Sequence, residues 1–117
     1  GSAHAAALFA ANGQLTVVYE DVGRHNALDK LIGNALLTGE LPLHDKGVIL
    51  SGRAGFELVQ KTRMAASPML VAIGAPSSLA VDLAWESGMT LAGFLRSTGF
   101  NVYSCPDRLT KPAPGES

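Results

Sequence analysis

Residues 47–73 read GVILSGRAGFELVQKTRMAASPMLVAI and contain a unit from which the rest of the architecture can be worked out. Two short apolar runs, at 47–51 and 69–73, have the length and the Gly/Pro boundaries of buried strands. Between them, residues 56–66 have helical spacing, and Glu57 and Lys61 are four residues apart, where an ion pair would support the helix. Strand, helix and strand in this order predict two parallel strands joined by a right-handed crossover.

Upstream of this unit, Asn12-Gly13 separates two apolar runs at 4–10 and 14–20. Asn-Gly between apolar runs is a strong signal for a tight hairpin, so both runs are predicted as strands. The first run is rich in alanine, which favours helix, and a helix there stays an alternative.

Helical spacing, caps and strand-like runs continue on both sides of the central unit. The remaining predicted elements are a helix at 25–38 that ends at Gly39 and Pro42, a helix capped by Ser77 or Ser78 that runs to about 87, and strands at 90–95 and 100–104. The order is ββαβαβαβ with one short extra strand. It predicts an α/β protein with a mixed, mostly parallel sheet in a three-layer α/β/α sandwich.

Composition limits the class of protein. The chain has 117 residues, a formal net charge of -1 and a single cysteine. That length suits one domain, and a charge near zero argues against non-specific binding to nucleic acid or to a membrane surface. No apolar run approaches a membrane span, and one cysteine supports neither a disulfide framework nor a zinc site.

We expect a cytoplasmic domain over 3–108, an expression scar at 1–2 and a disordered tail at 109–117. Because the chain opens inside an apolar run, we also expect it to be part of a longer protein.

The loops that follow the predicted parallel strands carry the unusual polar residues. Such loops emerge at one edge of an open α/β sheet, where ligands bind. The polar residues expected at this edge are Asp21, Arg24, His25, Asn26, Ser51, Arg53, Ser77, Ser78 and Arg96.

An anionic ligand suits this edge. Three helix N-termini carry free N–H groups and partial positive charge, and Gly23, Gly52 and Gly55 allow the backbone to approach a ligand closely. Arg24 and Arg53 can each hold phosphate oxygens in a bidentate manner. Neither a Walker loop nor the dinucleotide G-x-G-x-x-G pattern is present. Ordinary helix capping is the alternative explanation of these serines and glycines.

Two helical pairs are predicted at the start of the helix at 25–38. Asp29 is one turn from His25 and could orient its imidazole, and Lys30 is one turn from Asn26; a solvated helix face is the alternative. No serine lies in a nucleophile elbow, and Cys105 is interpreted as a bystander. No catalytic residue and no metal ligand are therefore assigned.

Five strings in order, spanning residues 4 to about 108, resemble the formate dehydrogenase accessory sulfurtransferase family (FdhD/NarQ). The strings are HAAALF at 4–9, EDVGRHNALDK at 20–30, SGRAGFELVQK at 51–61, APSSLAVDLA at 75–84 and FNVYS at 100–104.

This resemblance implies a function. Members of the family carry sulfur from a cysteine desulfurase to the molybdenum of the bis-molybdopterin guanine dinucleotide cofactor, which formate dehydrogenase needs. It also implies a cytidine-deaminase-like fold, a cytoplasmic homodimer and binding of guanine nucleotides, for which GDP is a mimic. By motif, the pocket residues would be Arg24, His25, Asn26, Ser51, Gly52 and Arg53, together with the stretch Phe100, Asn101, Val102, Tyr103, Ser104 and Cys105.

The chain departs from the family pattern at one place. The family's sulfur carrier is a cysteine in a C-x-x-C loop before the HAAALF string, and that loop is absent from these residues. Cys105 is not at a matching position, so we expect cofactor binding without sulfur transfer. Ala6 stands where a deaminase would have its catalytic glutamate, which argues against deaminase chemistry. The alternative function is a dimerisation and docking module with no ligand site of its own.

Overall fold

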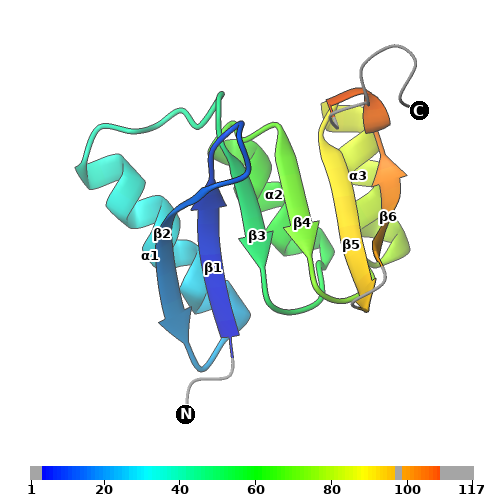
Figure 1. Cartoon of the computed structure of the whole chain (residues 1–117), viewed down its shortest axis with the longest axis horizontal. Coiled ribbons are helices and arrows are strands. Elements are labelled where there is room, and N and C mark those ends of the chain that lie inside the picture. Colours follow the sequence, from blue (N-terminus) through cyan, green and yellow to red (C-terminus); the bar gives the residue numbers. More distant parts are fainter. Residues whose placement is uncertain (1–3, 97–98, 109–117) are drawn as a thin grey trace.

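The computed structural model describes residues 4–96 and 99–108, which form one six-stranded sheet and three α-helices (Figure 1). The predictions for residues 1–2 and 109–117 lie outside this part of the chain. The elements are β1 (His4–Phe9), β2 (Leu15–Asp21), α1 (Arg24–Leu37), β3 (Gly47–Leu50), α2 (Phe56–Met64), β4 (Met69–Ala72), α3 (Ser78–Ser87), β5 (Thr90–Arg96), β6 (Gly99–Ser104) and a 3-10 turn at Pro106–Arg108.

The sheet is mixed, as predicted, with strand order β2-β1-β3-β4-β5-β6. Strands β3, β4 and β5 are parallel, whereas β1 is antiparallel to both of its neighbours and β6 is antiparallel to β5. The α/β class and the mixed sheet are therefore confirmed. Antiparallel pairs lie at both edges, and only the pairs β3–β4 and β4–β5 are parallel, fewer than the predicted mostly parallel sheet implies.

The alanine-rich first run is a strand, because its position between two other strands outweighs its helix propensity. Ala6 pairs with Tyr19 on one side and with Leu50 on the other, and it is fully buried. The hairpin turn is closed by Gly13, which has a φ of 86° and donates its N–H to the Ala10 carbonyl at 2.8 Å. A positive φ of this kind favours glycine.

The third helix is bounded by two local signals. Ser77, not Ser78, is its N-cap, and the Ser77 hydroxyl accepts a hydrogen bond from the Ala80 N–H at 3.1 Å. Gly88 ends the helix with a φ of 69°, the left-handed conformation typical of a C-terminal glycine.

One hydrophobic core lies between the sheet and the helices. It is built from fully buried leucines on both sides, because every second residue of each strand faces the helices. The strands contribute Leu8, Leu50, Leu70 and Leu91, and the helices contribute Leu28, Leu31 and Leu58.

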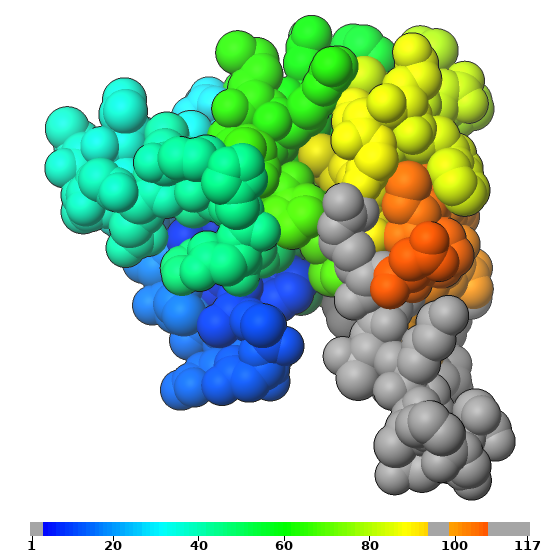
Figure 2. Space-filling model, turned by 90° about the horizontal axis from the view of Figure 1, so that it is seen from above, coloured from blue at the N-terminus to red at the C-terminus, as the bar shows by residue number. Residues whose placement is uncertain are grey.

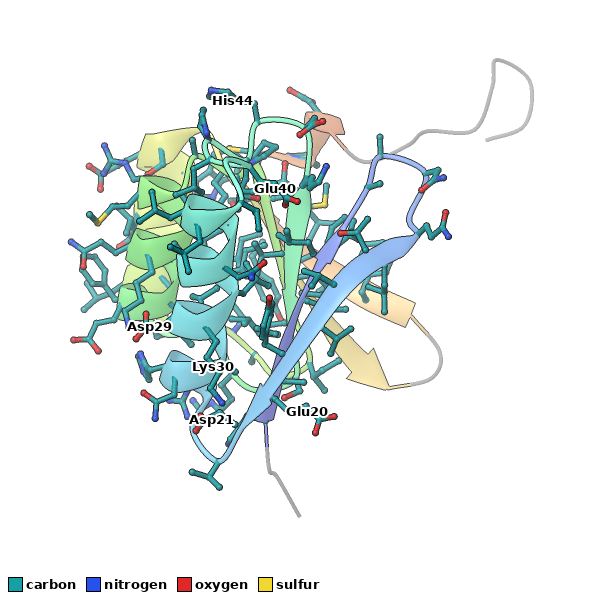
Figure 3. The ribbon with its side chains drawn as sticks, turned by 90° about the vertical axis from the view of Figure 1, so that its left-hand side faces the viewer. Glu20, Asp21, Asp29, Lys30, Glu40 and His44 are labelled. Carbon is teal, nitrogen blue, oxygen red and sulfur yellow. The ribbon has the colours of Figure 1, made fainter. Side chains whose placement is uncertain are left out.

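All three helices pack on the same face of the sheet (Figures 1 and 3). Each crossover moves in one direction along the sheet, from β2 past β1 to β3, then to β4 and β5. Right-handed crossovers that advance in one direction place their helices on one side, and a second layer needs a reversal of direction. Residues 4–96 and 99–108 therefore supply two of the three predicted layers, and the second helical layer is not among them.

No helix in the described residues has both the length and the apolar character needed to cross a membrane.

Candidate functional site

The loops that follow β2, β3 and β4 meet at one edge of the sheet, as predicted; it is the lower edge in Figure 1. Two of them are joined through their backbones: the Gly74 N–H donates to the Gly52 carbonyl at 3.3 Å, and the Ser77 N–H donates to the Ala54 carbonyl at 3.1 Å. We call this edge the rim; it comprises residues 21–26, 51–55 and 73–78 together with His4.

His4, Arg24 and Gly52 are in direct contact at the rim. A Cβ placed on Gly52 would lie 3.2 Å from Arg24 Cδ and 3.2 Å from His4 Nδ1, so a side chain at position 52 would crowd both. His4 Nδ1 and Arg24 Nε are buried and have no hydrogen-bond partner among the described residues. Buried polar groups are normally satisfied, so the rim holds two nitrogen atoms suited to an additional oxygen atom.

His4 is not among the residues that the sequence predicts at this edge, because it lies in a strand and not in a loop that follows one. The signal was the direction of β1. Because β1 is antiparallel to β3, its first residue lies at the edge where β3 ends.

Arg53 lies across Gly74. A Cβ on Gly74 would lie 2.6 Å from Arg53 Cγ, so only glycine allows this approach. Gly74 also lies close to Gly93 of β5, because a Cβ on Gly93 would be 3.0 Å from the Gly74 carbonyl oxygen. The same Cβ would be 3.2 Å from the Tyr103 ring. Arg53 is exposed, which leaves its guanidinium accessible above a surface of packed glycines.

The helix N-termini at the rim differ in how they are capped. Helices α1 and α2 begin after Gly23 and Gly55, and neither N-cap residue has a side-chain hydrogen bond. The first N–H groups of these helices are suited to an anion, whereas the N-terminus of α3 is already capped by Ser77.

Asp21 anchors the first loop of the rim. Its carboxylate accepts hydrogen bonds from the Gly23 N–H at 3.1 Å and from Asn26 Nδ2 at 3.4 Å, and it pairs with Lys30 Nζ at 2.8 Å (Figure 3). The hydrogen bond from Lys30, followed by that from Gly23, lowers the pKa of Asp21 from 3.8 to about 2. Within the described residues Arg24 and Arg53 form no ion pair, so both guanidiniums are available to a ligand at the rim. The side chain of Arg96, also predicted at this edge, lies outside the part that the structure describes.

The predicted pairs on the first turns of α1 are wrong. The Asp29 carboxylate pairs with Lys61 Nζ of α2 at 2.9 Å instead of orienting His25, and this contact also replaces the predicted pair between Glu57 and Lys61. Asn26 and Lys30 do not pair with each other, because both bind Asp21. Tertiary contacts between neighbouring elements therefore take precedence over helical spacing here.

The rim serines are used in the structure of the loops. The Ser51 hydroxyl accepts a hydrogen bond from the Ala5 N–H at 2.8 Å and ties β1 to the loop after β3. Ser77 caps α3, and Ser78 is the exposed first residue of that helix. His25 is half-buried and Asn26 is exposed at the start of α1, so both lie at the rim.

Strand β6 brings only one end of the predicted binding stretch near the rim. Gly99 pairs with Arg96, where β5 ends, and from there the strand runs to the opposite edge. At that edge the Ser104 hydroxyl is buried, accepts from the Leu91 N–H and donates to the Met89 carbonyl. Phe100 and Asn101 thus lie near the rim, but Ser104 and Cys105 do not, because six strand residues span roughly 17 Å.

Among the described residues there is no group of three or more His, Cys, Asp or Glu side chains that could hold a metal ion.

A sequence model of the FdhD/NarQ family matches residues 1–110, which is nearly the whole chain. The chain belongs to the FdhD/NarQ family. Curated relatives named sulfur carrier protein FdhD include those of Streptomyces coelicolor, 59% identical over 93% of this chain, and Sulfurisphaera tokodaii, 51% identical over 93% of this chain. The recognition made from the sequence strings is therefore confirmed.

The fold is shared with a solved member of the family. A crystal structure described as a formate dehydrogenase accessory protein from Desulfotalea psychrophila superposes with a TM-score of 0.82 at 37% identity, over 92% of this chain and 47% of that chain. The chain also spans only 39% of the length of the Streptomyces coelicolor relative and 43% of the Sulfurisphaera tokodaii relative.

Proposed function

We propose that the rim binds the phosphate groups of a guanine nucleotide, as part of a sulfur carrier protein that serves formate dehydrogenase. The observation that carries this proposal is the meeting of Arg24, Arg53 and His4 at one edge, where two buried nitrogen atoms have no partner in the part of the chain that the structure describes. Guanidinium groups bind phosphate oxygens in a bidentate manner, and uncapped helix N-termini add N–H donors.

The ligand would be one nucleotide end of the bis-molybdopterin guanine dinucleotide cofactor, which is the substrate of the sulfur transfer. The residues of this chain would hold the diphosphate: Arg53 above Gly74, Arg24 and His4 beside Gly52. Phe100 and Asn101 are the members of the β6 stretch placed closest to this site. The selectivity for guanine comes from the family resemblance and from no particular contact.

In the complete family protein, sulfur would pass from a cysteine desulfurase to the molybdenum of this cofactor, in a cytoplasmic homodimer. The names of the relatives, which call them sulfur carrier proteins, support this role. The single cysteine of this chain, Cys105, lies at the edge opposite the rim, so this domain would contribute binding and not the sulfur-carrying group.

Calorimetric titration with GDP tests the proposal. We compare the unchanged chain with Arg53→Ala and with a control, Arg63→Ala, which removes another exposed arginine, in the last turn of α2 and away from the rim. Losing one charge-assisted contact of about 1.5–3 kcal/mol should weaken GDP binding roughly 10- to 100-fold in Arg53→Ala and leave it unchanged in Arg63→Ala.

Equal GDP affinities for the unchanged chain and Arg53→Ala would remove Arg53 from the site. No binding at millimolar GDP would overturn the proposal and favour a docking module without a ligand site.

A further inference from the structure

A hollow of about 330 Å³ lies between the second half of α1 and the hairpin, at the end of the sheet opposite the rim; we call it the α1 hollow. Its floor is apolar, because Leu8 of β1 and Leu31 and Ala35 of α1 are 2% exposed or less. Figure 2 shows the segment that follows α1, at 38–46, in cyan to green beside the blue hairpin. The volume of the α1 hollow lies at the lower end of the range for small-molecule sites.

A β-bulge brings a hydroxyl to the α1 hollow. Leu8 pairs with Val17 and Phe9 pairs with Leu15, so Thr16 is an extra residue without a partner on β1. Thr16 and Val17 are adjacent in the sequence, yet both line the hollow. A regular strand would point them to opposite faces, and bulges that redirect a side chain are common beside binding sites. The Thr16 hydroxyl lies 3.5 Å from the Leu8 carbonyl oxygen, too far for a strong hydrogen bond, so it can donate to a ligand.

Lys46 brings a positive charge to the α1 hollow with little compensation. Its side chain is 25% exposed, and its ammonium lies 3.9 Å from the Asp45 carboxylate, compared with 2.8 and 2.9 Å in the ion pairs of Lys30 and Lys61. Asp45 is itself 84% exposed, so water screens this long pair. A mostly buried ammonium is stabilised by an anion at hydrogen-bond distance, and no described residue supplies one.

Glu40 brings the opposite charge to the same hollow (Figure 3). Among the described residues, neither its carboxylate nor the side-chain amide of Asn34 has an ion-pair or hydrogen-bond partner. The backbone fixes both charged residues: the Glu40 N–H donates to the Ala35 carbonyl at 2.8 Å, and the Lys46 carbonyl accepts from the Ser67 hydroxyl at 2.7 Å. Because Glu40 and Lys46 form no ion pair with each other, a ligand with both charges can bind between them.

We propose that the α1 hollow binds a small zwitterion, an α-amino acid with an apolar side chain. Lys46 binds the carboxylate of the ligand, Glu40 binds its ammonium, and the apolar side chain lies on the floor formed by the leucines. The Thr16 hydroxyl and the Asn34 amide supply further hydrogen bonds. Apolar walls with a few placed polar groups are typical of sites that bind small molecules.

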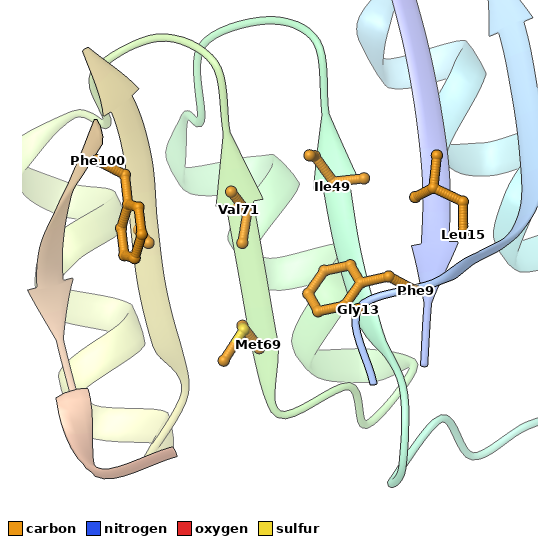
Figure 4. Close-up of a pocket in the computed structure, with 8 residues that line it drawn as sticks. Phe9, Gly13, Leu15, Ile49, Met69, Val71 and Phe100 are labelled. Atoms are coloured by element: carbon orange, nitrogen blue, oxygen red, sulfur yellow. The ribbon is translucent and has the colours of Figure 1, made fainter. Parts of the chain in front are cut away.

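Other ligands suit the α1 hollow less well. A phosphate would meet the Glu40 carboxylate, which repels it, and an uncharged apolar molecule would leave both charges unpaired. The hollow of about 260 Å³ on the other side of the sheet is different. Its described lining, which includes Phe9, Leu15 and Phe100, consists of apolar side chains and one glycine, so it offers no group that would orient a zwitterion (Figure 4).

The first test compares three ligands on the unchanged 117-residue chain, by NMR titration of its amide signals. L-leucine carries both charges, 4-methylpentanoate lacks the ammonium, and 3-methylbutylamine lacks the carboxylate. L-leucine should bind with a Kd of about 1 mM or tighter. Each analogue should bind about tenfold more weakly or worse, because it lacks one charge-assisted contact.

The second test uses variants. Lys46→Met and Glu40→Gln should each weaken binding of L-leucine by about tenfold or more. Lys46→Met should leave the affinity for 3-methylbutylamine unchanged, and Glu40→Gln should leave that for 4-methylpentanoate unchanged, because each analogue lacks the charge that the lost residue binds. The control is Glu57→Gln, which changes an exposed carboxylate in the first turn of α2 and should leave L-leucine binding unchanged. GDP binding at the rim should be the same in all three variants.

No change in the amide signals at about 10 mM L-leucine would overturn the proposal. Equal affinities for L-leucine and its two analogues would also overturn it, and this comparison does not depend on how the variants fold. Binding of L-leucine that neither Lys46→Met nor Glu40→Gln weakens would overturn it in favour of an apolar hollow without charge recognition.

Discussion

Replacing Ser104 with alanine removes a single oxygen atom, but it should destabilise the fold strongly. The Ser104 hydroxyl accepts from the Leu91 N–H at 3.0 Å and donates to the Met89 carbonyl at 2.8 Å, where the pairing of β5 and β6 shifts register. Ser104 is 1% exposed and Leu91 is fully buried, so water cannot replace the lost hydroxyl. Ser104→Ala leaves two buried groups unsatisfied, the Leu91 N–H and the Met89 carbonyl, at a cost of about 1–3 kcal/mol each, which gives about 2–6 kcal/mol for the substitution.

For a domain of this size, that loss should lower the melting temperature by at least about 8 °C in a calorimetric scan. Thr62→Val is the matched control, because the Thr62 hydroxyl is equally buried but donates to the Leu58 carbonyl, which lies within a helix. The free energy of unfolding of Thr62→Val should be less than about 1 kcal/mol below that of the unchanged chain. The reasoning fails if Ser104→Ala and Thr62→Val melt at the same temperature.

Acid titration and two glycines supply further predictions. Because the pKa of Asp21 falls from 3.8 to about 2 on folding, its stabilisation is complete above about pH 4 and is lost as the pH falls toward 2. The difference in melting temperature between the unchanged chain and Asp21→Asn should therefore shrink between pH 4 and pH 2, and a constant difference would contradict this. Gly88→Ala should destabilise the fold by about 1 kcal/mol, since its φ is 69°, and chemical denaturation measures this. Gly33→Ala, inside α1 with open space around its Cα, should stabilise it by about 0.5–1 kcal/mol, so the two alanine variants should shift the denaturation midpoint in opposite directions.

The element order could be predicted from the sequence because its local signals agree with the tertiary structure. Asn12-Gly13 forms the hairpin turn, and Ser77 and Gly88 bound α3 as cap residues. Where local and tertiary preferences conflicted, periodicity alone was insufficient. The alanine run at 4–9 left helix open, and only its pairing with two neighbouring strands makes it β1.

The number of layers could not be read from the order of elements. Right-handedness determines which face of the sheet a crossover helix covers only when it is known whether the next strand is added to the left or to the right of the previous one. No local sequence signal gives that order of the strands. The position of β1 between β2 and β3 makes the first crossover advance the same way as the next two.

The convergence of the rim loops was predictable because it follows from topology, but the partners of individual side chains were not. Asp29 has a histidine one helical turn away and binds Lys61 of a different helix. A pair across two helices depends on how they pack, which sequence spacing does not contain. The same limit applies to His4, whose neighbours at positions 24 and 52 are distant in the chain.

The hydrogen bonds between the loop after β3 and the loop after β4 make these two segments one cooperative unit. Their amide protons at positions 74 and 77 should exchange with solvent at a common rate, set by joint opening and not by separate fluctuations. If one residue is substituted in each loop, the change in unfolding free energy of the double variant should differ from the sum of the two single changes. Substitutions accepted in one loop during evolution should therefore depend on the sequence of the other.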